Sequence, residues 1–484
     1  MINNAGALKL VGVPTGSPSS VQLVDASAAA GLGPFATVVY VDQVRGNDLT
    51  GARGNANLPF ATVQAAINAM QTGDTLLGAP QLFTITAAIT IPAALVRFAV
   101  AGPTPIGVVS FSNPSGIFQI RQTTAGQPVF SLGTNLGLTK AHFVNVAMTP
   151  GTGAKAILAD GSAYAVNTFL SSGLRCDFSS VTVDAKYCAV TPIQLNGCIN
   201  NSDLSVVNCA GITLNGMPNF SGSLLATYDA TDPLSPTNQT LVTLRNGSQV
   251  GGVASGTKLT IGGQVTLYVD QTSSVGGLTA IGLSVVGAKA PSISFCGYVG
   301  SVGGIDFNTA GAELPDTATA LTLDFRGARF YYLTAQSSLA TAVVGPAAIN
   351  IKIAGAAANP QTVRMDATMS LDTPVAITAH ANVNITGRGA RWPNATLSTP
   401  DASGSILPPS PLLLAPVAVA AAPQPVTYPC RIPAGSTAVQ VSYQTSNAGS
   451  VPTGVITATT TAGFSAGLVA AGGGNLTASV SFPG

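Results

Sequence analysis

The stretch that decides the fold runs from Tyr40 to Ile91. It begins Tyr40-Val-Asp-Gln-Val-Arg-Gly-Asn-Asp-Leu-Thr-Gly51 and, after Pro59, continues Phe60-Ala-Thr-Val-Gln-Ala-Ala-Ile-Asn-Ala-Met70. The first part is a polar loop of residues that tolerate turn geometry. Apolar residues of the second part recur at steps of three and four, which predicts a short helix near 60–70. Gly73-Asp74-Thr75 ends that helix, and the alternating residues that follow predict strands.

This order of strand, polar loop, single helix, Gly-Asp-Thr and strand resembles the entry segment of right-handed parallel β-helix proteins of the pectin-lyase-like type. The resemblance implies an all-β fold, in which a right-handed parallel β-helix is capped at its N-terminal end by the helix. It extends to phage tailspikes and other β-helical virion proteins, which assemble as parallel homotrimers. The residues that carry it are Tyr40, Asp42, Gly46, Asn47, Asp48, Gly51, Pro59, Phe60, Thr62, Gln64, Ala66, Ile67, Gly73, Asp74 and Thr75.

The composition points to an assembly component. Charged residues make up 8% of the 484 residues, against about 25% in an ordinary soluble domain. Apolar residues make up 46%, and weakly polar surface of this kind marks interfaces. The net charge of +1 argues against a nucleic-acid partner. The longest apolar run, 412–422, is too short to span a membrane, and the N-terminus lacks the pattern of a secretory signal.

Internal periodicity supports a solenoid. Ile193, Leu195, Asn196 and Gly197 recur 19 residues later as Ile212, Leu214, Asn215 and Gly216. Val181 and Val183 recur 23 residues later as Leu204 and Val206. Self-similarity at about 20 residues is the mark of stacked coils that bury their faces against one another. We therefore expect Leu195 to stack with Leu214 and Val181 with Leu204, all pointing inward.

Composition shifts divide the chain into four segments. Residues 1–36 form a Gly/Ser/Ala-rich arm that we expect to serve attachment. Residues 37–404 form the β-helix, and 405–429 form a Pro/Ala-rich linker of the kind that acts as an extended spacer. Residues 430–484 form a small C-terminal β domain. A domain of that size has a marginal core alone, so trimerisation is expected to stabilise it.

No metal or cofactor site is expected. The closest cysteines are ten residues apart, and only His142 and His380 are present. The spacing of the coils places Cys176 near Cys198 and Cys188 near Cys209. These pairs are either buried thiols that act as small apolar fillers or disulfides between coils.

Carboxylates are the only enzymatic candidates. Glycoside hydrolysis needs two carboxyl groups that face each other across the sugar. Asp184 and Asp203 are 19 residues apart and can lie one coil apart on one face. Their flanking residues are aliphatic apart from two serines and a threonine, so we expect solvated carboxylates and no catalysis.

One aromatic cluster offers a candidate binding patch for a sugar or a protein partner. It consists of Phe325, Arg326, Arg329, Tyr331 and Tyr332. The alternative is an aromatic stack within the solenoid or at a subunit interface, because aromatic side chains dominate cores and interfaces.

These observations predict a viral structural protein of the virion: a spike, fibre or capsid-associated subunit. Its expected partners are two further copies in a homotrimer and other virion proteins that contact the N-terminal arm. The first alternative is a tailspike that binds or cleaves a host-surface polysaccharide. The second is a bacterial surface adhesin.

Overall fold

The computed structural model shows an all-β protein and describes residues 37–103, 117–132, 140–160, 173–179, 181–186, 192–198, 204–207, 209–217, 222–227, 240–251, 259–263, 265–283, 292–300, 305–306, 322–331, 347–351, 361–371, 375–379, 382–392, 396–400, 402–409, 412–413, 417–419, 424–427, 440–445, 459–460, 463–466 and 474–481. The chain divides into two compact units, which are described separately. Unit 1 comprises residues 1–225 and 229–248, and unit 2 comprises 226–228 and 249–484. In the described ranges no helix is long and apolar enough to cross a membrane.

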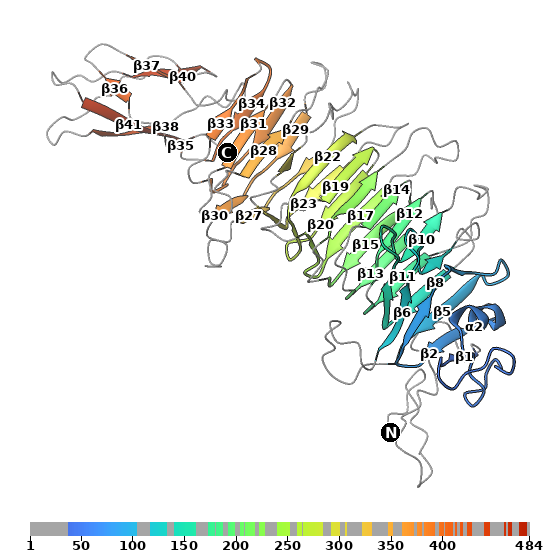
Figure 1. The fold of residues 1–484 in the computed structure, drawn as a ribbon. Helices are drawn as coiled ribbons and strands as arrows, with labels where there is room; N and C mark the ends of the chain where they lie inside the picture. Colours follow the sequence, from blue (N-terminus) through green and yellow to red (C-terminus); the bar gives the residue numbers. More distant parts are fainter. Residues whose placement is uncertain are drawn as a thin grey trace, which may run out of the picture. The chain divides into compact units, whose positions relative to one another are not determined.

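Unit 1 is built from stacked parallel strands (Figure 1). Its first sheet contains, in order, β1 (Val38–Val41), β2 (Thr75–Gly78), β5 (Arg97–Ala101), β8 (Lys140–Val144), β11 (Gly173–Asp177), β13 (Pro192–Asn196), β15 (Gly211–Asn215) and β17 (Thr240–Arg245). The second contains β4 (Ile89–Thr90), β7 (Phe130–Ser131), β10 (Ile157–Asp160), β12 (Val183–Lys186), β14 (Leu204–Val207) and β16 (Leu224–Thr227), which begins in this unit. A third, shorter sheet contains β3 (Leu82–Ile85), β6 (Phe118–Gln122) and β9 (Val146–Thr149).

Successive strands of the chain alternate between these sheets, so each turn of the chain adds one strand to each large sheet. Alternate side chains point inward and are apolar, as the period of two requires. On β13 and β15, for example, Ile193, Leu195, Ile212 and Leu214 are at most 1% exposed. Phenylalanine rings fill the first coils, with Phe130 and Phe143 centroids 4.9 Å apart.

The predicted helix is present as α2 (Val63–Ala69). Thr62 is its N-cap, with its hydroxyl accepting a hydrogen bond from the Ala65 N–H. Val63, Ala66 and Ile67 are buried, and the helix contacts β1 and β4. These two strands are the terminal members of the two large sheets.

The polar loop before α2 is also as the sequence indicates. Asp48 accepts hydrogen bonds from the backbone of Ala61 and Thr62 and from the Thr62 hydroxyl. A Cβ on Gly46 would lie 2.2 Å from the Phe60 carbonyl oxygen, so only glycine fits there. The loop is thereby tied to the start of the helix.

A left-handed residue turns the chain at the end of each first-sheet strand from β8 to β17, namely β8, β11, β13, β15 and β17. The positive φ angles are 53° at Asn145, 49° at Phe178, 57° at Gly197, 61° at Gly216 and 56° at Asn246. The backbone N–H of each of the first four donates to the carbonyl of the residue that ends the next strand of the sheet, at 2.8–3.1 Å. The ladder of hydrogen bonds therefore continues around the corner.

The register confirms one predicted stack and corrects the other. Leu195 pairs with Leu214, and Asn196 pairs with Asn215, at the predicted shift of 19. In the second sheet, however, Asp184 pairs with Ser205 and Ala185 with Val206. The shift there is 21 rather than 23, so the prediction that Val181 stacks with Leu204 is wrong, although both side chains are buried.

Unit 2 contains three parallel sheets, which the chain visits in a fixed order. The first contains β20 (Val265–Val269), β23 (Ser292–Phe295), β26 (Thr322–Asp324), β29 (Gln361–Arg364), β32 (Val383–Thr386) and β34 (Ser405–Leu407). The second contains β19 (Leu259–Gly263), β22 (Leu278–Leu283), β25 (Ile305–Asp306), β28 (Ala347–Ile351), β31 (Val375–Ala379) and β33 (Thr396–Ser398). The third contains β18 (Gln249–Val250), β21 (Ser274–Val275), β24 (Tyr298–Gly300), β27 (Arg329–Tyr331) and β30 (Met369–Leu371).

The last strands of unit 2 pair differently, in antiparallel fashion. β41 (Gly474–Ser481) pairs with β35 (Leu412–Leu413), β36 (Val417–Val419) and β38 (Gln440–Thr445). β40 (Gly463–Ala466) pairs with β37 (Gln424–Thr427) and β39 (Thr459–Thr460). The predicted linker 405–429 thus contains short strands that pair with the C-terminal segment. The N-terminal arm lies outside the described residues, and the predicted domain boundaries stay predictions.

Candidate functional site

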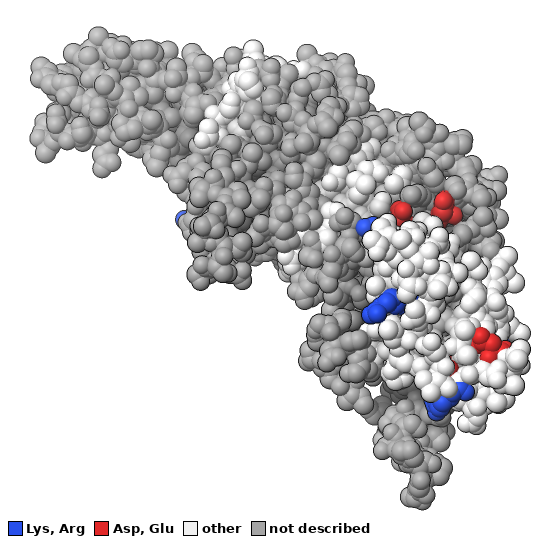
Figure 2. All heavy atoms as spheres, viewed as in Figure 1, with Lys and Arg blue, Asp and Glu red and all other residues white. Residues whose placement is uncertain are grey.

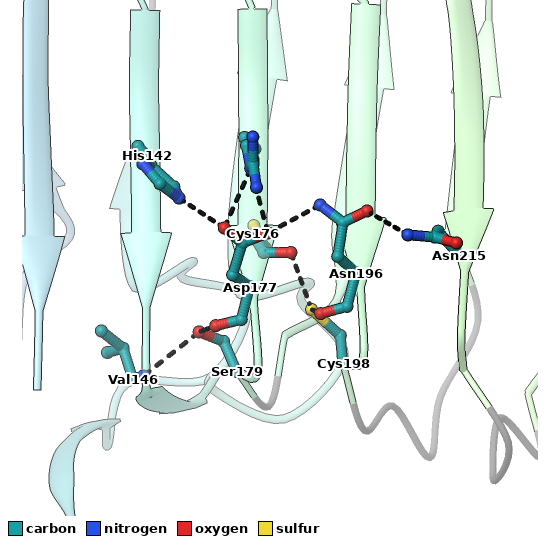
Figure 3. A network of polar contacts seen from close by, with 9 residues as sticks. His142, Val146, Cys176, Asp177, Ser179, Asn196, Cys198 and Asn215 are labelled. Carbon is teal, nitrogen blue, oxygen red and sulfur yellow. Dashed lines mark hydrogen bonds and ion pairs between the residues drawn. The ribbon is translucent and has the colours of Figure 1, made fainter. Parts of the chain in front are cut away.

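A dense polar cluster among the described residues of unit 1 surrounds Asp177, at the end of β11 (Figure 3). His142 from the neighbouring strand β8 places its Nε2 2.8 Å from Asp177 Oδ2. Arg175, two residues before Asp177 on the same outward face, donates its Nε at 2.9 and 3.0 Å to the two carboxylate oxygens. Asn196, the register partner of Asp177 on β13, donates its Nδ2 at 2.6 Å. Three strands therefore converge on one carboxylate.

Hydrogen bonds decide the charge of this carboxylate. Burial raises the pKa of Asp177, but the hydrogen bonds from His142, Arg175 and Asn196 outweigh it and lower the pKa to about 2. Asp177 is only 8% exposed. An ionised carboxylate with three donors fits a structural acceptor, and it is a poor proton donor at neutral pH.

The cluster extends along the sheet as a ladder of amides. Asn215 donates its Nδ2 at 3.0 Å to Asn196 Oδ1. Asn246 in turn donates its Nδ2 at 2.5 Å to Asn215 Oδ1. Each amide accepts from one neighbour while donating to the other, so the side chains of Asp177, Asn196, Asn215 and Asn246 form one continuous line. This line follows the left-handed corner and fixes the register of four coils.

Two thiols lie just inside the same corner. Cys198 donates its Sγ–H to the Cys176 carbonyl oxygen at 3.1 Å, which confirms that these cysteines lie close together. Burial raises the pKa of the Cys198 thiol to about 12, and it also raises the pKa of Cys176 well above the usual value for a thiol. Both are free thiols, as are Cys209 and Cys296. Cys188 lies outside the described residues. A buried thiol with a raised pKa is a poor nucleophile.

Phe178 is the exposed aromatic side chain of this region. It is 61% exposed and adopts φ of 49°, a conformation that is rare for a bulky residue. A Cβ on Gly197 would lie 2.8 Å from the Phe178 ring, so the ring lies directly over that glycine. Strain of this kind at an exposed aromatic residue is a reason to suspect a role in binding.

Of the two predicted catalytic carboxylates, the structure describes Asp184 alone. Asp184 lies on β12, half-buried, with Leu158 and Ser205 as its register partners. Asp203 lies outside the described residues. No group of three or more His, Cys, Asp or Glu side chains able to hold a metal occurs in the described ranges, and His380 lies outside them.

The predicted aromatic patch is divided between the interior and the exposed surface of unit 2. Phe325 is fully buried, with its ring 6.0 Å from that of Phe295, so it offers no surface to a ligand. Arg326 forms an ion pair with Asp324 at 2.6 Å, and its hydrogen bonds lower the pKa of that carboxyl. Arg329 lies over the Tyr298 ring at 5.2 Å. Tyr331 belongs to β27, and Tyr332 lies outside the described residues.

The sequence analysis did not identify the cluster around Asp177. His142 and Asp177 are 35 residues apart, with no motif between them. One signal was present: continuing the 19-residue repeat backwards aligns Asp177 with Asn196 and Asn215. That alignment indicates the ladder, although not the histidine.

No protein-family model matches the chain, and comparisons with curated proteins and with solved structures give no match either.

Proposed function

We propose that the chain is a virion structural protein, a spike, fibre or capsid-associated subunit, whose right-handed parallel β-helix acts by assembly and attachment. The observation that carries the proposal is that outward-facing side chains of the stacked sheets form columns of uncharged polar residues. In the first sheet of unit 1, Gln194, Thr213 and Thr243 follow one another in register. In unit 2, Thr266, Ser292 and Thr322 do the same.

A surface of this type is suited to permanent contact with protein. Among described residues, charged side chains are sparse on the face shown in Figure 2. Large apolar side chains are also exposed, among them Val44, Leu49 at 96%, Leu241 and Tyr268. Depletion of charge together with exposed apolar groups is what distinguishes the core of a protein–protein interface.

The proposal also assigns a role to α2. The helix contacts β1 and β4, and unpaired terminal strands are templates for pairing with other chains. A helix across these strands protects their edges. We therefore assign α2 as the N-terminal cap of the β-helix, which leaves the sides of the coils for assembly.

The expected assembly is a homotrimer, with the N-terminal arm contacting other virion proteins and the segment 430–484 stabilising the trimer. The test is the mass of the purified chain at micromolar concentration, measured by light scattering after size exclusion. The expected result is three times the chain mass of 48.1 kDa. A monomer that persists at this concentration would contradict the proposal.

A second candidate, a tailspike that binds a host glycan, is favoured by one observation, the exposed and strained Phe178. Aromatic rings beside hydrogen-bonding groups are suited to stacking on sugars. The test is incubation with capsular and cell-wall glycans, with binding and new reducing ends measured. This candidate requires binding that is lost in Phe178→Ala, and cleavage lost in Asp184→Asn or Asp203→Asn would establish an enzyme. An adhesin has no specific observation in its favour.

A further inference from the structure

Five arginines gather on three successive coils of unit 2, at the corner between its first and third sheets. At the end of the first-sheet strands, Asp324 pairs with Arg364 in register, and Arg364 pairs with Thr386. The corner residues follow. The N–H of Gly327 donates to the Asp366 carbonyl, and the N–H of Ala367 donates to the Arg388 carbonyl. Arg326, Asp366 and Arg388 therefore stand one above another.

Asp324, Arg364 and Thr386 form one column across the coils, and Arg326, Asp366 and Arg388 form a second. A third column lies just beyond the corner. Arg329 pairs with Met369 on β30. The N–H of Arg391 donates to the Thr368 carbonyl, just as the N–H of Arg329 donates to the Gly297 carbonyl of the coil before it. Arg391 thus continues the column of Arg329 and Met369. Neighbouring strands are about 4.8 Å apart, so adjacent guanidinium groups of the three columns are within reach of one extended ligand.

The charges of this arginine corner are unbalanced. Arg326, Arg329, Arg364, Arg388 and Arg391 are all exposed, and the acidic residues described in the same columns are Asp324 and Asp366, which leaves a net charge of +3 among these residues. Elsewhere in the described chain, Arg45 is paired with Asp42, Arg53 with Asp74 and Arg175 with Asp177, whereas Arg97, Arg121 and Arg245 are exposed single arginines. Here Arg326 is paired with Asp324, and Arg329 donates to the Tyr298 hydroxyl.

The remaining three arginines have unused donors. Among described residues, no side-chain hydrogen bond or ion pair is formed by Arg364, Arg388 or Arg391. The backbone N–H of Arg388 does donate to Asp366 Oδ1 at 2.8 Å. In a chain with 19 basic residues altogether, three solvated guanidinium groups on two adjacent coils are a notable concentration.

We propose that the arginine corner is a binding site for tetrahedral oxyanions, phosphate or sulfate, carried on an extended ligand. A guanidinium group presents a rigid fork of donors that matches such oxygens. A carboxylate has two oxygens and saturates one fork, whereas a tetrahedral oxyanion presents further oxygens to a second arginine. The site lies on a different unit from the Asp177 cluster and does not depend on the proposed function.

The probes are two polymers that share this chemistry, fluorescent linear polyphosphate and dextran sulfate, with neutral dextran as the blank. Binding to the full-length chain is measured by fluorescence anisotropy at several NaCl concentrations. We expect at least one anionic polymer to bind, with an affinity that falls as salt rises. The triple variant Arg364→Gln, Arg388→Gln, Arg391→Gln should bind at least tenfold more weakly and with a smaller salt dependence.

The matched control is Arg97→Gln, Arg121→Gln, Arg245→Gln, which removes the same charge from exposed arginines of unit 1. The control should bind like the unmodified chain, and circular dichroism should show both variants folded. If the triple variant of the corner does not fold, the three single variants serve instead, each with a smaller loss of affinity. Binding of polyphosphate alone identifies phosphate as the ligand group, and binding of dextran sulfate alone identifies sulfate. Binding of neither, or equal weakening in the control, overturns the proposal.

Discussion

At the scale of single residues, Asp177 is a strongly constrained side chain of unit 1. Its carboxylate is buried and accepts hydrogen bonds from His142, Arg175 and Asn196. Hydrogen bonds to a charged group contribute more than neutral ones, and a buried carboxylate that loses its donors is costly. The charge of Asp177 is therefore coupled to the stability of the coils that it joins.

We predict that Asp177→Asn lowers the free energy of unfolding at pH 7 by about 2 kcal/mol, because a pKa shift is a difference in stability. The pKa of Asp177 is about 2 in the folded chain, below 3.8 for a free carboxyl. Its contribution is thus complete above the unfolded pKa and is lost as the pH falls through 2. Urea unfolding at pH 7, 4 and 2.5 checks this. A difference between the proteins that stays constant down to pH 2.5 would refute the assignment.

Phe178 is a second residue whose contribution to stability can be tested, because its backbone adopts a strained positive φ. The equivalent corner positions hold Asn145, Gly197, Gly216 and Asn246, which are residue types that tolerate positive φ. We predict that Phe178→Asn stabilises the fold by about 1 kcal/mol, measured by urea unfolding. Phe178→Ala removes the ring but keeps a side chain that disfavours positive φ, so it should bring no gain. Stabilisation by both variants would show that ring exposure, and not backbone strain, is the cause.

At the scale of elements, the stacked strands explain which expectations from sequence held. The shift of 19 was predictable because Ile-x-Leu-Asn-Gly recurs with its glycine at the left-handed corner, and the corner anchors the register. The shift of 23 was wrong by two residues. A slip of two leaves every inward side chain facing inward, so the hydrophobic pattern alone cannot distinguish 21 from 23. No turn residue before β12 marks the corner, so the sequence does not fix the number of residues between paired positions in the second sheet.

The candidate sites show the same limit. The Cys176–Cys198 proximity followed from the coil spacing, whereas the contact of His142 with Asp177 depends on a connection of 28 residues between β8 and β11, whose length no pattern predicts. Arg326 and Arg329 are indicated by the sequence itself, because aromatic residues lie beside them. Arg364, Arg388 and Arg391 join them only through the register of successive coils.

The central stack gives a prediction for one element. Leu214 on β15 is fully buried between Leu195 and Leu244, its partners on either side. Leu214→Ala should lower the free energy of unfolding by about 3 kcal/mol, the cost of lost apolar contact plus a cavity. The control is Thr213→Ala, the outward neighbour, with an expected change within about 0.5 kcal/mol. Equal effects of the two changes, measured by urea unfolding, would contradict the inward orientation.

At the scale of the whole molecule, the scarcity of charge sets how copies of the chain should associate. An interface made from uncharged columns gains its free energy from burial of apolar surface, which salt does not screen. An interface held by ion pairs weakens as salt rises. The response of the assembly to salt therefore distinguishes the two.

We predict that the proposed homotrimer persists unchanged between 0.05 and about 1 M NaCl, where the Debye length has fallen to about 3 Å. Sedimentation velocity at both salt concentrations measures this. Binding at the arginine corner serves as an internal contrast, because the same change in salt should abolish it. A trimer that dissociates at high salt would contradict an interface of uncharged columns.

The left-handed corner has a practical consequence for engineering the chain. Asn196 and Asn215 are separated by 19 residues, whereas Asn215 and Arg245, the next pair in register, are separated by 30. Both intervals include the same two-residue corner, so the additional length lies entirely in the connections elsewhere on the coil. A single residue inserted beside Gly197 should therefore disrupt the register of the coils. The corner thus fixes the register, while the length of the coil away from the corner can vary.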